Sequence, residues 1–369
     1  MKKKREGWLD AVKTIAIFIV LLNHAQVGIP GVNFWGGMFY VPVFFVLAGF
    51  TYRTKEISYR EFIKEKAKRL LLPYLAANLF YLLFFACKEW VVDGGFHTVG
   101  MQSVIGILYA RNQLYLSART MPEKNVFFLH LQNAPTWFLP ALFVSLAVFD
   151  GLMRLFKEDL KRTGLVISIG LFLQFFYHYI SPVLLPWSLD AVPFFTALLE
   201  VGYSIGKTDF LEKACRDKKA SLFCLAAGTV FVLTALWNGS ANLSIGEYGK
   251  SMIIDLYNAV TASFLIMLLC YRAECGGRRS YLPRILYKPG KYTLTILCYH
   301  LFVFLFLQSG IAVLCEMAGM REDSVVPVLL RFGMIPVTIA GISCAGSILN
   351  RIRERKRNAQ GMKRSIFKQ

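Results

Sequence analysis

A lysine and a histidine stand eleven residues apart near the start of the chain, at Lys13 and His24. Successive residues of an α-helix turn by roughly 100°, so this spacing brings both side chains to one face, roughly 16 Å apart along the axis. A neutral imidazole can take a proton from a hydroxyl near neutral pH, and an ammonium group can bind an anion. The pair therefore predicts a general base and an anion-binding group on one helix.

Asp10 precedes Lys13 by three residues, and we expect the two side chains to pair. Asn23, or an amide of the following helix, is a candidate donor to an oxyanion. A histidine within an apolar helix is also often a structural residue whose hydrogen bonds are satisfied by the protein. The residues by themselves leave the catalytic and the structural interpretation of His24 open.

The helices that position these groups are expected to cross a membrane. Apolar and aromatic residues make up 56% of the 369 residues, which is too apolar for an ordinary soluble domain. Ten stretches satisfy the length criterion of about 17–25 residues for a spanning helix. They are residues 14–30, 34–52, 70–92, 136–156, 163–180, 188–207, 219–237, 251–271, 290–313 and 325–350. The sequence predicts an all-α integral membrane protein with about ten transmembrane helices.

Most of the 42 lysines and arginines fall in alternate connecting segments. These segments are Lys2–Arg5, Arg53–Arg69, Arg154–Arg162, Lys207–Lys219, Arg272–Lys291 and the tail from Arg351. Because cytoplasmic loops are enriched in these residues, ten spans with both termini in the cytoplasm account for the whole pattern. We predict a single multi-pass membrane domain over residues 1–350 and a basic, disordered cytoplasmic tail over residues 351–369.

Several other functions lack support in the sequence. The net charge of +19 is explained by the loops, so no nucleic-acid partner is expected. No P-loop and no dinucleotide-binding glycine motif occurs. The eight cysteines include no Cys-x-x-Cys pair, and neither disulfides nor a metal site is expected. Residues 202–206 match the G-x-S-x-G nucleophile pattern, but that pattern requires a strand-to-helix turn, whereas these residues lie in an apolar span.

A basic segment leads into the third predicted span. Ser58 and Glu61 form a capping-box pattern that predicts a helix start, and Lys66, Lys68 and Arg69 follow close to the bilayer. These three cations are candidates for binding either anionic lipid headgroups or the phosphates of a nucleotide-like cofactor.

Polar residues also occur within the predicted spans. They are Asp190, Glu200, Asp255, His300 and Arg331. Charged groups at this depth are costly, so they usually face a cavity or a partner. An ion pair of Arg331 with Glu200 or with Asp255 would be a purely structural solution, and the sequence does not choose between these pairs. Trp137 enters the fourth span either as an interfacial aromatic or as a substrate contact. In the second span, Pro42 is expected to kink the helix and Gly49 to admit a close neighbour.

These residues together resemble the membrane acyltransferase 3 family. They are Leu9-Asp10-x-x-Lys13 with His24, Pro42-x-Phe44-Phe45-x-Leu47-x-Gly49-Phe50, Lys66-Ala67-Lys68-Arg69-Leu70 with Pro73-Tyr74, Trp137-Phe138-Leu139-Pro140, and Tyr299-His300. The resemblance covers residues 8–345. Residues 186–190 and 193–195 are similar to the fucose 4-O-acetylase-like branch of the family. Many members carry arginine where Lys13 stands, and an acidic residue or histidine where Tyr40 and Val41 stand.

The resemblance implies a ten-helix enzyme in a bacterial plasma membrane. Such an enzyme moves an acyl group, usually acetyl, from cytoplasmic acyl-CoA to a hydroxyl of an extracytoplasmic glycan or lipid-linked sugar. It implies a functional pair at His24, as general base, and Lys13. The candidate acyl-CoA-binding residues are Lys66, Lys68 and Arg69, and the candidate substrate-binding residues are Trp137, Glu200 and His300. Two alternatives remain: a transporter or flippase for a glycan precursor, and a non-catalytic component of polysaccharide export.

Overall fold

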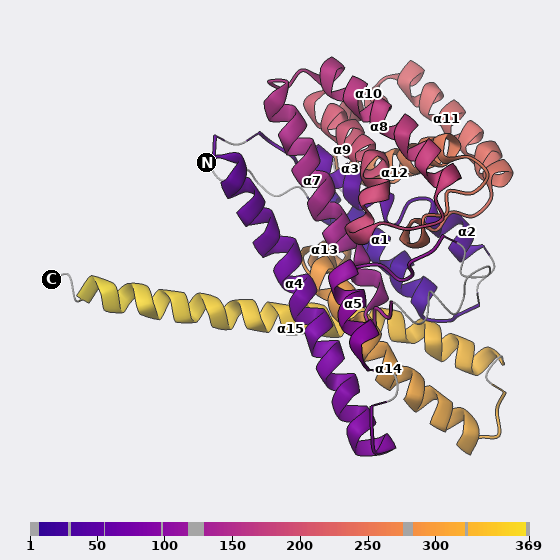
Figure 1. Cartoon of the computed structure of the whole chain (residues 1–369), viewed down its shortest axis with the longest axis vertical. Helices are drawn as coiled ribbons and strands as arrows, with labels where there is room; N and C mark the ends of the chain where they lie inside the picture. The colour runs from indigo at the N-terminus through magenta and orange to yellow at the C-terminus, as the bar shows by residue number, and fades with distance from the viewer. Residues whose placement is uncertain are drawn as a thin grey trace. The chain divides into compact units, whose positions relative to one another are not determined.

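The structure is a computed structural model that describes residues 7–28, 31–54, 56–96, 99–116, 129–275, 283–321 and 324–366. Regular structure in these ranges is helical, with only two isolated β-bridges (Figure 1). The protein is an all-α integral membrane protein, as predicted. The chain divides into two compact units, Met1–Gly28 with Pro283–Gln369 and Ile29–Leu282. The single membrane domain over residues 1–350 stays a prediction, and the basic flank Lys2–Arg5 lies outside the described residues.

The first unit joins the two ends of the sequence. Its elements are α1 (Gly7–His24), η5 (Arg284–Leu286), α13 (Tyr287–Lys291), α14 (Thr293–Met317) and α15 (Val325–Ile366). Helix α1 packs against α13, α14 and α15, and α14 packs along α15. The polar face of α1 therefore lies among helices from the last quarter of the chain.

Helix α13 approaches α1 backbone to backbone. A Cβ atom at Gly290 would overlap the main-chain carbonyl of Asp10, so this contact requires glycine. The Thr14 hydroxyl, one turn further along α1, lies 2.6 Å from the carbonyl oxygen of Leu286 and 3.0 Å from that of Asp10. These contacts hold the first half of α1, which includes Lys13, against the α13 segment.

The second unit contains the remaining elements. They are α2 (Val32–Gly37), α3 (Pro42–Phe50), α4 (Tyr59–Lys88), η1 (Glu89–Asp93), α5 (Met101–Tyr109), η2 (Ala134–Trp137), α7 (Phe138–Leu155), α8 (Leu160–Ile180), η3 (Pro186–Ala191), α9 (Val192–Lys207), α10 (Phe210–Arg216), α11 (Lys218–Asn238), η4 (Leu243–Ile245) and α12 (Met252–Cys275). Helix α9 contacts α3, α7, α8 and α12, so it forms the centre of this unit (Figure 1).

Glycines allow α3 and α9 to pack at unusually short range. A Cβ atom at Gly49 of α3 would overlap the carbonyl of Leu199, and one at Gly202 of α9 would overlap the carbonyl of Val46. The close approach predicted at Gly49 is confirmed. Gly206, four residues after Gly202, would bring a Cβ atom within 2.6 Å of the Phe50 carbonyl oxygen. The G-x-S-x-G match thus includes two helix-packing glycines.

The second predicted span is not one continuous helix. Helix α2 ends at Gly37, and α3 begins at Pro42. Proline is well tolerated in the first turn of a helix, because the backbone N–H that it lacks has no intrahelical partner there. Pro42 was expected to kink a helix; in the structure it begins one instead.

Eight described helices are long and apolar enough to cross a membrane, and they coincide with eight of the ten predicted spans. The other two predictions, 34–52 and 188–207, contain α3 and α9, which have 9 and 16 residues. Both helices are largely buried against neighbouring helices, where shorter or interrupted segments are tolerated at membrane depth. The count of ten crossings and the cytoplasmic location of both termini stay predictions.

The ends of two helices test further expectations. Helix α4 begins with the predicted capping box: the Glu61 N–H donates to the Ser58 hydroxyl at 3.3 Å, and the Ser58 N–H donates to the Glu61 carboxylate at 2.9 Å. Helix α15 continues beyond its apolar part to Ile366, as the long yellow helix of Figure 1. Residues 351–366 are therefore helical, and the predicted disorder is wrong for them. Arginine, lysine and glutamate have good helix propensity, which explains this result.

Candidate functional site

The two histidines at the candidate site belong to different helices of the first unit. His24 is the last residue of α1, and His300 lies in the first half of α14. Their ring centroids are 5.3 Å apart, and the ring planes are inclined by 46°. His300 is fully buried, whereas His24 is partly accessible. The structure therefore brings a buried imidazole beside the predicted general base.

The hydrogen bonds of His300 define its tautomer. Its Nδ1 lies 3.0 Å from the carbonyl oxygens of Ile296 and Leu297. Carbonyl oxygens only accept hydrogen bonds, so Nδ1 carries the proton and neutral His300 has its lone pair on Nε2. Nε2 is buried and has no hydrogen-bond partner among the described residues. Next to His24, the carbonyl oxygen Oδ1 of Asn23 is likewise buried without a partner in the described ranges.

Lys13 forms the predicted ion pair with Asp10. The Lys13 Nζ lies 3.6 Å from Asp10 Oδ1, with the carboxylate buried and 30% of the lysine side chain exposed. The i,i+3 spacing was sufficient to predict this pair.

The structure adds two cations that the sequence analysis did not select. Lys288 and Lys291 belong to α13 and flank Gly290, the residue in contact with the Asp10 backbone. Both side chains are exposed. The Lys288 Nζ lies 3.5 Å from the Cys344 Sγ of α15, and Lys288 and Lys291 belong to the short helix that packs against α1. The signal available in the sequence was only a basic segment ahead of a span, which is common to all cytoplasmic loops.

The predicted acyl-CoA-binding residues lie in the second unit, on the first turns of α4. Lys66 lies 5.0 Å from the ring centroid of Phe62, in a cation–π contact, and Lys68 and Arg69 are exposed. Binding of these three cations to lipid headgroups and their binding to cofactor phosphates both stay predictions.

The predicted substrate-binding residues Trp137 and Glu200 also belong to the second unit. Trp137 is buried at the end of η2, with its ring centroid 6.1 Å from that of Phe195. It is therefore a core residue here rather than an exposed member of an interfacial belt. Glu200 is half-buried on α9 and faces α8, where a Cβ atom at Gly164 would lie 2.8 Å from its Oε1. Of the three predicted substrate-binding residues, His300 is the one that contacts His24.

One of the polar residues within the predicted spans has an ion-pair partner in the structure. Asp190 forms an ion pair with Arg111, which is wholly buried and which the sequence analysis did not single out. Arg111 follows the short helix α5. Asp255 is buried near the start of α12. Arg331 belongs to the first unit and Glu200 and Asp255 to the second, so their pairing stays a prediction.

Comparison with known protein families gives a match over nearly the whole chain. A family model described as an acyltransferase domain, of the acyltransferase 3 type, matches residues 6–346. The chain belongs to this acyltransferase family. No curated protein and no solved structure gives a significant match. The acyltransferase 3 match confirms the resemblance at family level, while the fucose 4-O-acetylase-like branch stays a prediction.

The acyltransferase 3 match decides between the classes of function considered above. A multi-pass membrane chain in this family is a membrane acyltransferase, which favours an enzyme over a transporter or a non-catalytic export component. The matched range includes α1 with Lys13 and His24 as well as α14 with His300. The family match itself assigns no role to these residues.

Proposed function

We propose that this acyltransferase carries an acetyl group from cytoplasmic acetyl-CoA to a hydroxyl of a glycan or lipid-linked sugar outside a bacterial plasma membrane. The observation that supports a particular catalytic residue is the contact between His24 and His300. A partly accessible imidazole beside a second, neutral imidazole is suited to exchange a proton with a substrate.

In the proposed reaction, His24 removes the proton of the acceptor hydroxyl while the hydroxyl oxygen attacks the thioester carbonyl. The resulting tetrahedral intermediate collapses, the carbon–sulfur bond breaks, and the proton passes from His24 to the leaving CoA thiolate. One ester and one free thiol replace one alcohol and one thioester, so atoms and charge balance. His300, whose protonated Nδ1 is held by two carbonyl groups, supplies a neutral neighbour that stabilises the charged form of His24.

The donor would be recognised by the cations near Asp10. Acyl-CoA carries several phosphate charges, and Lys13 of α1 and Lys288 and Lys291 of α13 are cations on two helices that pack together. Lys66, Lys68 and Arg69 are a second candidate group for the same phosphates. We favour Lys13, Lys288 and Lys291 as the donor-binding group, because Lys13 and His24 share one helix.

The test uses the full-length protein in lipid nanodiscs with acetyl-CoA labelled in the acetyl group and a glycan extract as acceptor. We expect wild type to release CoA and label the glycan, and His24→Gln to lower the rate by about 100-fold or more, because a general base typically contributes about 10²–10⁴. Lys13→Ala should raise the KM for acetyl-CoA, whereas Lys13→Arg, which keeps the charge, should retain most of the activity.

Thermal unfolding of each variant serves as the control for folding. Full activity of His24→Gln would contradict the role of His24 as general base. Failure of wild type to bind or consume acetyl-CoA, with several glycan acceptors present, would contradict acetyl transfer from CoA and favour a different donor.

A further inference from the structure

The end of α1 is rich in atoms that accept hydrogen bonds. His24 is the last residue of the helix, and the last carbonyl groups of an α-helix have no partner within it. No backbone hydrogen bond among the described residues reaches the carbonyl oxygens of Leu22, Asn23 or His24. Nε2 of His300 adds a buried acceptor atom beside the His24 ring. The protein therefore surrounds the predicted base with acceptor atoms.

The side-chain amide of Asn23 makes no hydrogen bond to any described residue. Its Oδ1 atom is buried without a partner, while the residue as a whole is half-buried. Because no hydrogen bond holds the amide, rotation about the Cβ–Cγ bond can turn either Oδ1 or Nδ2 toward a ligand. Buried polar atoms are nearly always hydrogen-bonded, so an amide without such bonds beside the predicted base is suited to bind a ligand.

The electrostatic character of the helix end favours a neutral hydroxyl over an oxyanion as the partner of Asn23. The C-terminal end of a helix carries a partial charge of roughly −0.5 elementary charge, which opposes a developing anion. A hydroxyl can donate to Oδ1 or to a nearby carbonyl group, and it can also accept from Nδ2. The position of Asn23 at the end of α1 therefore disfavours the oxyanion role that the sequence suggested for it.

The two histidines leave one nitrogen of His24 for the substrate. A neutral imidazole carries its proton on one nitrogen and a lone pair on the other, and Nε2 of His300 is an acceptor beside the His24 ring. With the N–H of His24 directed to His300, its lone pair is available to the acceptor hydroxyl. Consecutive helical residues diverge by roughly 100°, so Asn23 and His24 can contact two different groups of one ligand.

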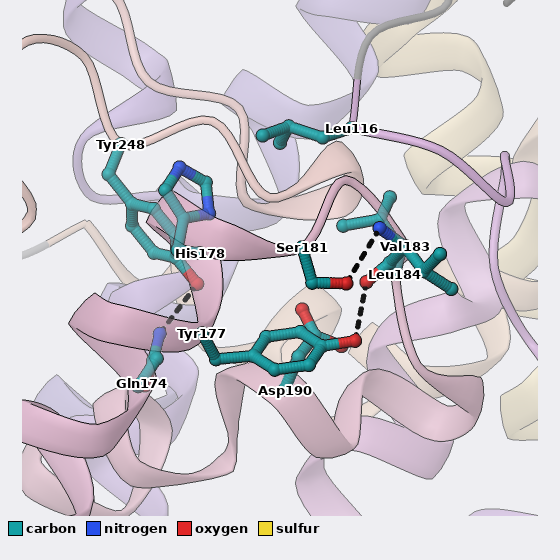
Figure 2. A pocket seen from close by; sticks show the side chains of 9 residues that line it. All are labelled: Leu116, Gln174, Tyr177, His178, Ser181, Val183, Leu184, Asp190 and Tyr248. Carbon is teal, nitrogen blue, oxygen red and sulfur yellow. Dashed lines mark hydrogen bonds between the residues drawn. The ribbon is translucent and has the colours of Figure 1, made fainter.

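The polar pocket of the second unit is too small to hold a sugar ring. It lies between the end of α8 and η3, and its wall contains His178, Asp190 and Tyr248 (Figure 2). The space enclosed there holds about one water molecule. In the same wall Gln174 donates to the Tyr248 hydroxyl at 2.9 Å, and Arg111 donates to Asp190. This pocket is therefore suited to an ordered water and not to the acceptor.

We propose that Asn23 binds a second hydroxyl of the acceptor, next to the hydroxyl that His24 deprotonates. The acceptor is then a sugar that carries two neighbouring free hydroxyl groups, which is a vicinal diol. Such a ligand brings protons to acceptor atoms that receive none from the described residues, namely the last carbonyl groups of α1 and Oδ1 of Asn23. This inference names the class of acceptor, and it rests on the proposed function.

Periodate oxidation tests for the diol, because periodate cleaves vicinal diols and leaves isolated hydroxyl groups intact. One portion of the glycan extract is treated with periodate and then borohydride, and a matched portion receives periodate already quenched with ethylene glycol. Full-length wild type in lipid nanodiscs should transfer label from acetyl-CoA to the matched portion. Labelling of the oxidised portion should be lower by about tenfold or more, the effect of losing one good hydrogen bond. Equal labelling of both portions would overturn the proposal.

Variants of Asn23 separate the binding of a hydroxyl from donation to an oxyanion. Asn23→Leu removes the polar group at similar size and should raise the KM for the glycan about tenfold, with the KM for acetyl-CoA unchanged. Asn23→Asp keeps the acceptor oxygens and should retain activity within about threefold. An oxyanion donor would instead lose about 10²–10³ in kcat in Asn23→Asp, and that result would overturn the proposal.

Gln26→Asn is the matched control, because Gln26 is exposed two residues beyond His24 and asparagine tolerates its φ of 54°. This change should leave both KM values unaltered, and melting temperatures in the same nanodiscs show whether each variant is folded. The periodate comparison needs no variant. If wild type fails to label the untreated extract, the proposed acetyl transfer fails. If wild type labels both portions equally, acetyl transfer stands and the diol inference alone fails.

Discussion

At the scale of single residues, His24 and His300 differ in the freedom of their rings. The Nδ1 atom of His300 is held by two main-chain carbonyl groups one turn earlier in α14, and its buried Nε2 keeps a lone pair. His24 lies at the end of α1 and stays partly accessible. A fixed neutral imidazole next to an accessible one favours a division of roles in which His24 exchanges protons and His300 positions it.

This division predicts the behaviour of His300→Phe. Phenylalanine keeps an aromatic ring beside His24 and Phe304 but removes both ring nitrogens. We expect kcat to fall about tenfold or more, with the KM for acetyl-CoA unchanged, because the change affects proton transfer rather than donor binding. Steady-state kinetics and a pH–rate profile provide the measurement. An unchanged kcat with an unchanged profile would show that His300 only fills space.

The sequence predicted some residue contacts and missed others for a physical reason. Helical periodicity relates residues within one element, which explains why the Asp10–Lys13 pair was predicted correctly. His24 and His300 meet only because two helices from opposite ends of the chain pack together. Arg111 was missed because an arginine in an outer loop is ordinarily solvated, and only the fold buries it against Asp190.

At the scale of elements, the contact between α3 and α9 depends on backbone proximity. A Cβ atom at Gly202 would overlap main-chain atoms of Val46 and Phe50, and a backbone cannot move aside as a flexible side chain does. Small residues at such positions allow van der Waals contact between whole helices, which is a main source of stability within a bilayer.

Gly202→Ala should therefore lower the stability of the protein. We expect a loss of about 1–3 kcal/mol, the usual cost of overpacking. The matched control is Gly228→Ala in α11, where the new Cβ atom would lie 3.6 Å from Leu265 Cδ1, an ordinary contact. That change should be neutral or stabilising by up to about 1 kcal/mol. Thermal unfolding in the same nanodiscs measures both. Equal melting temperatures would contradict the packing argument.

The length of an apolar run predicted eight spanning helices well but described the other two poorly. A hydrophobic segment is expected to be buried away from water. Its hydrophobicity does not show whether lipid or other protein segments surround it. Helices α3 and α9 are apolar because other helices enclose them. Pro42 and Pro193 lie in their first turns, where proline favours the start of a helix whatever the thickness of the bilayer.

At the scale of the whole molecule, the first unit draws its candidate catalytic residues from both ends of the chain. Helix α1 supplies Lys13 and His24, and the segment from α13 to α14 supplies Lys288, Lys291 and His300. The proposed reaction also has a direction: the cations belong to the side predicted to be cytoplasmic, and His24 lies further along α1. An acyl group would therefore enter from one side of the membrane and leave on the other.

The most direct measurement of this central claim is acetyl transfer across sealed membrane vesicles of defined orientation. Inside-out vesicles are loaded with the glycan acceptor and receive labelled acetyl-CoA outside, and right-side-out vesicles receive the same additions. We predict labelled glycan within inside-out vesicles containing wild-type protein, and none with His24→Gln or in intact right-side-out vesicles. Equal labelling in both orientations, or labelling that survives His24→Gln, would contradict the account.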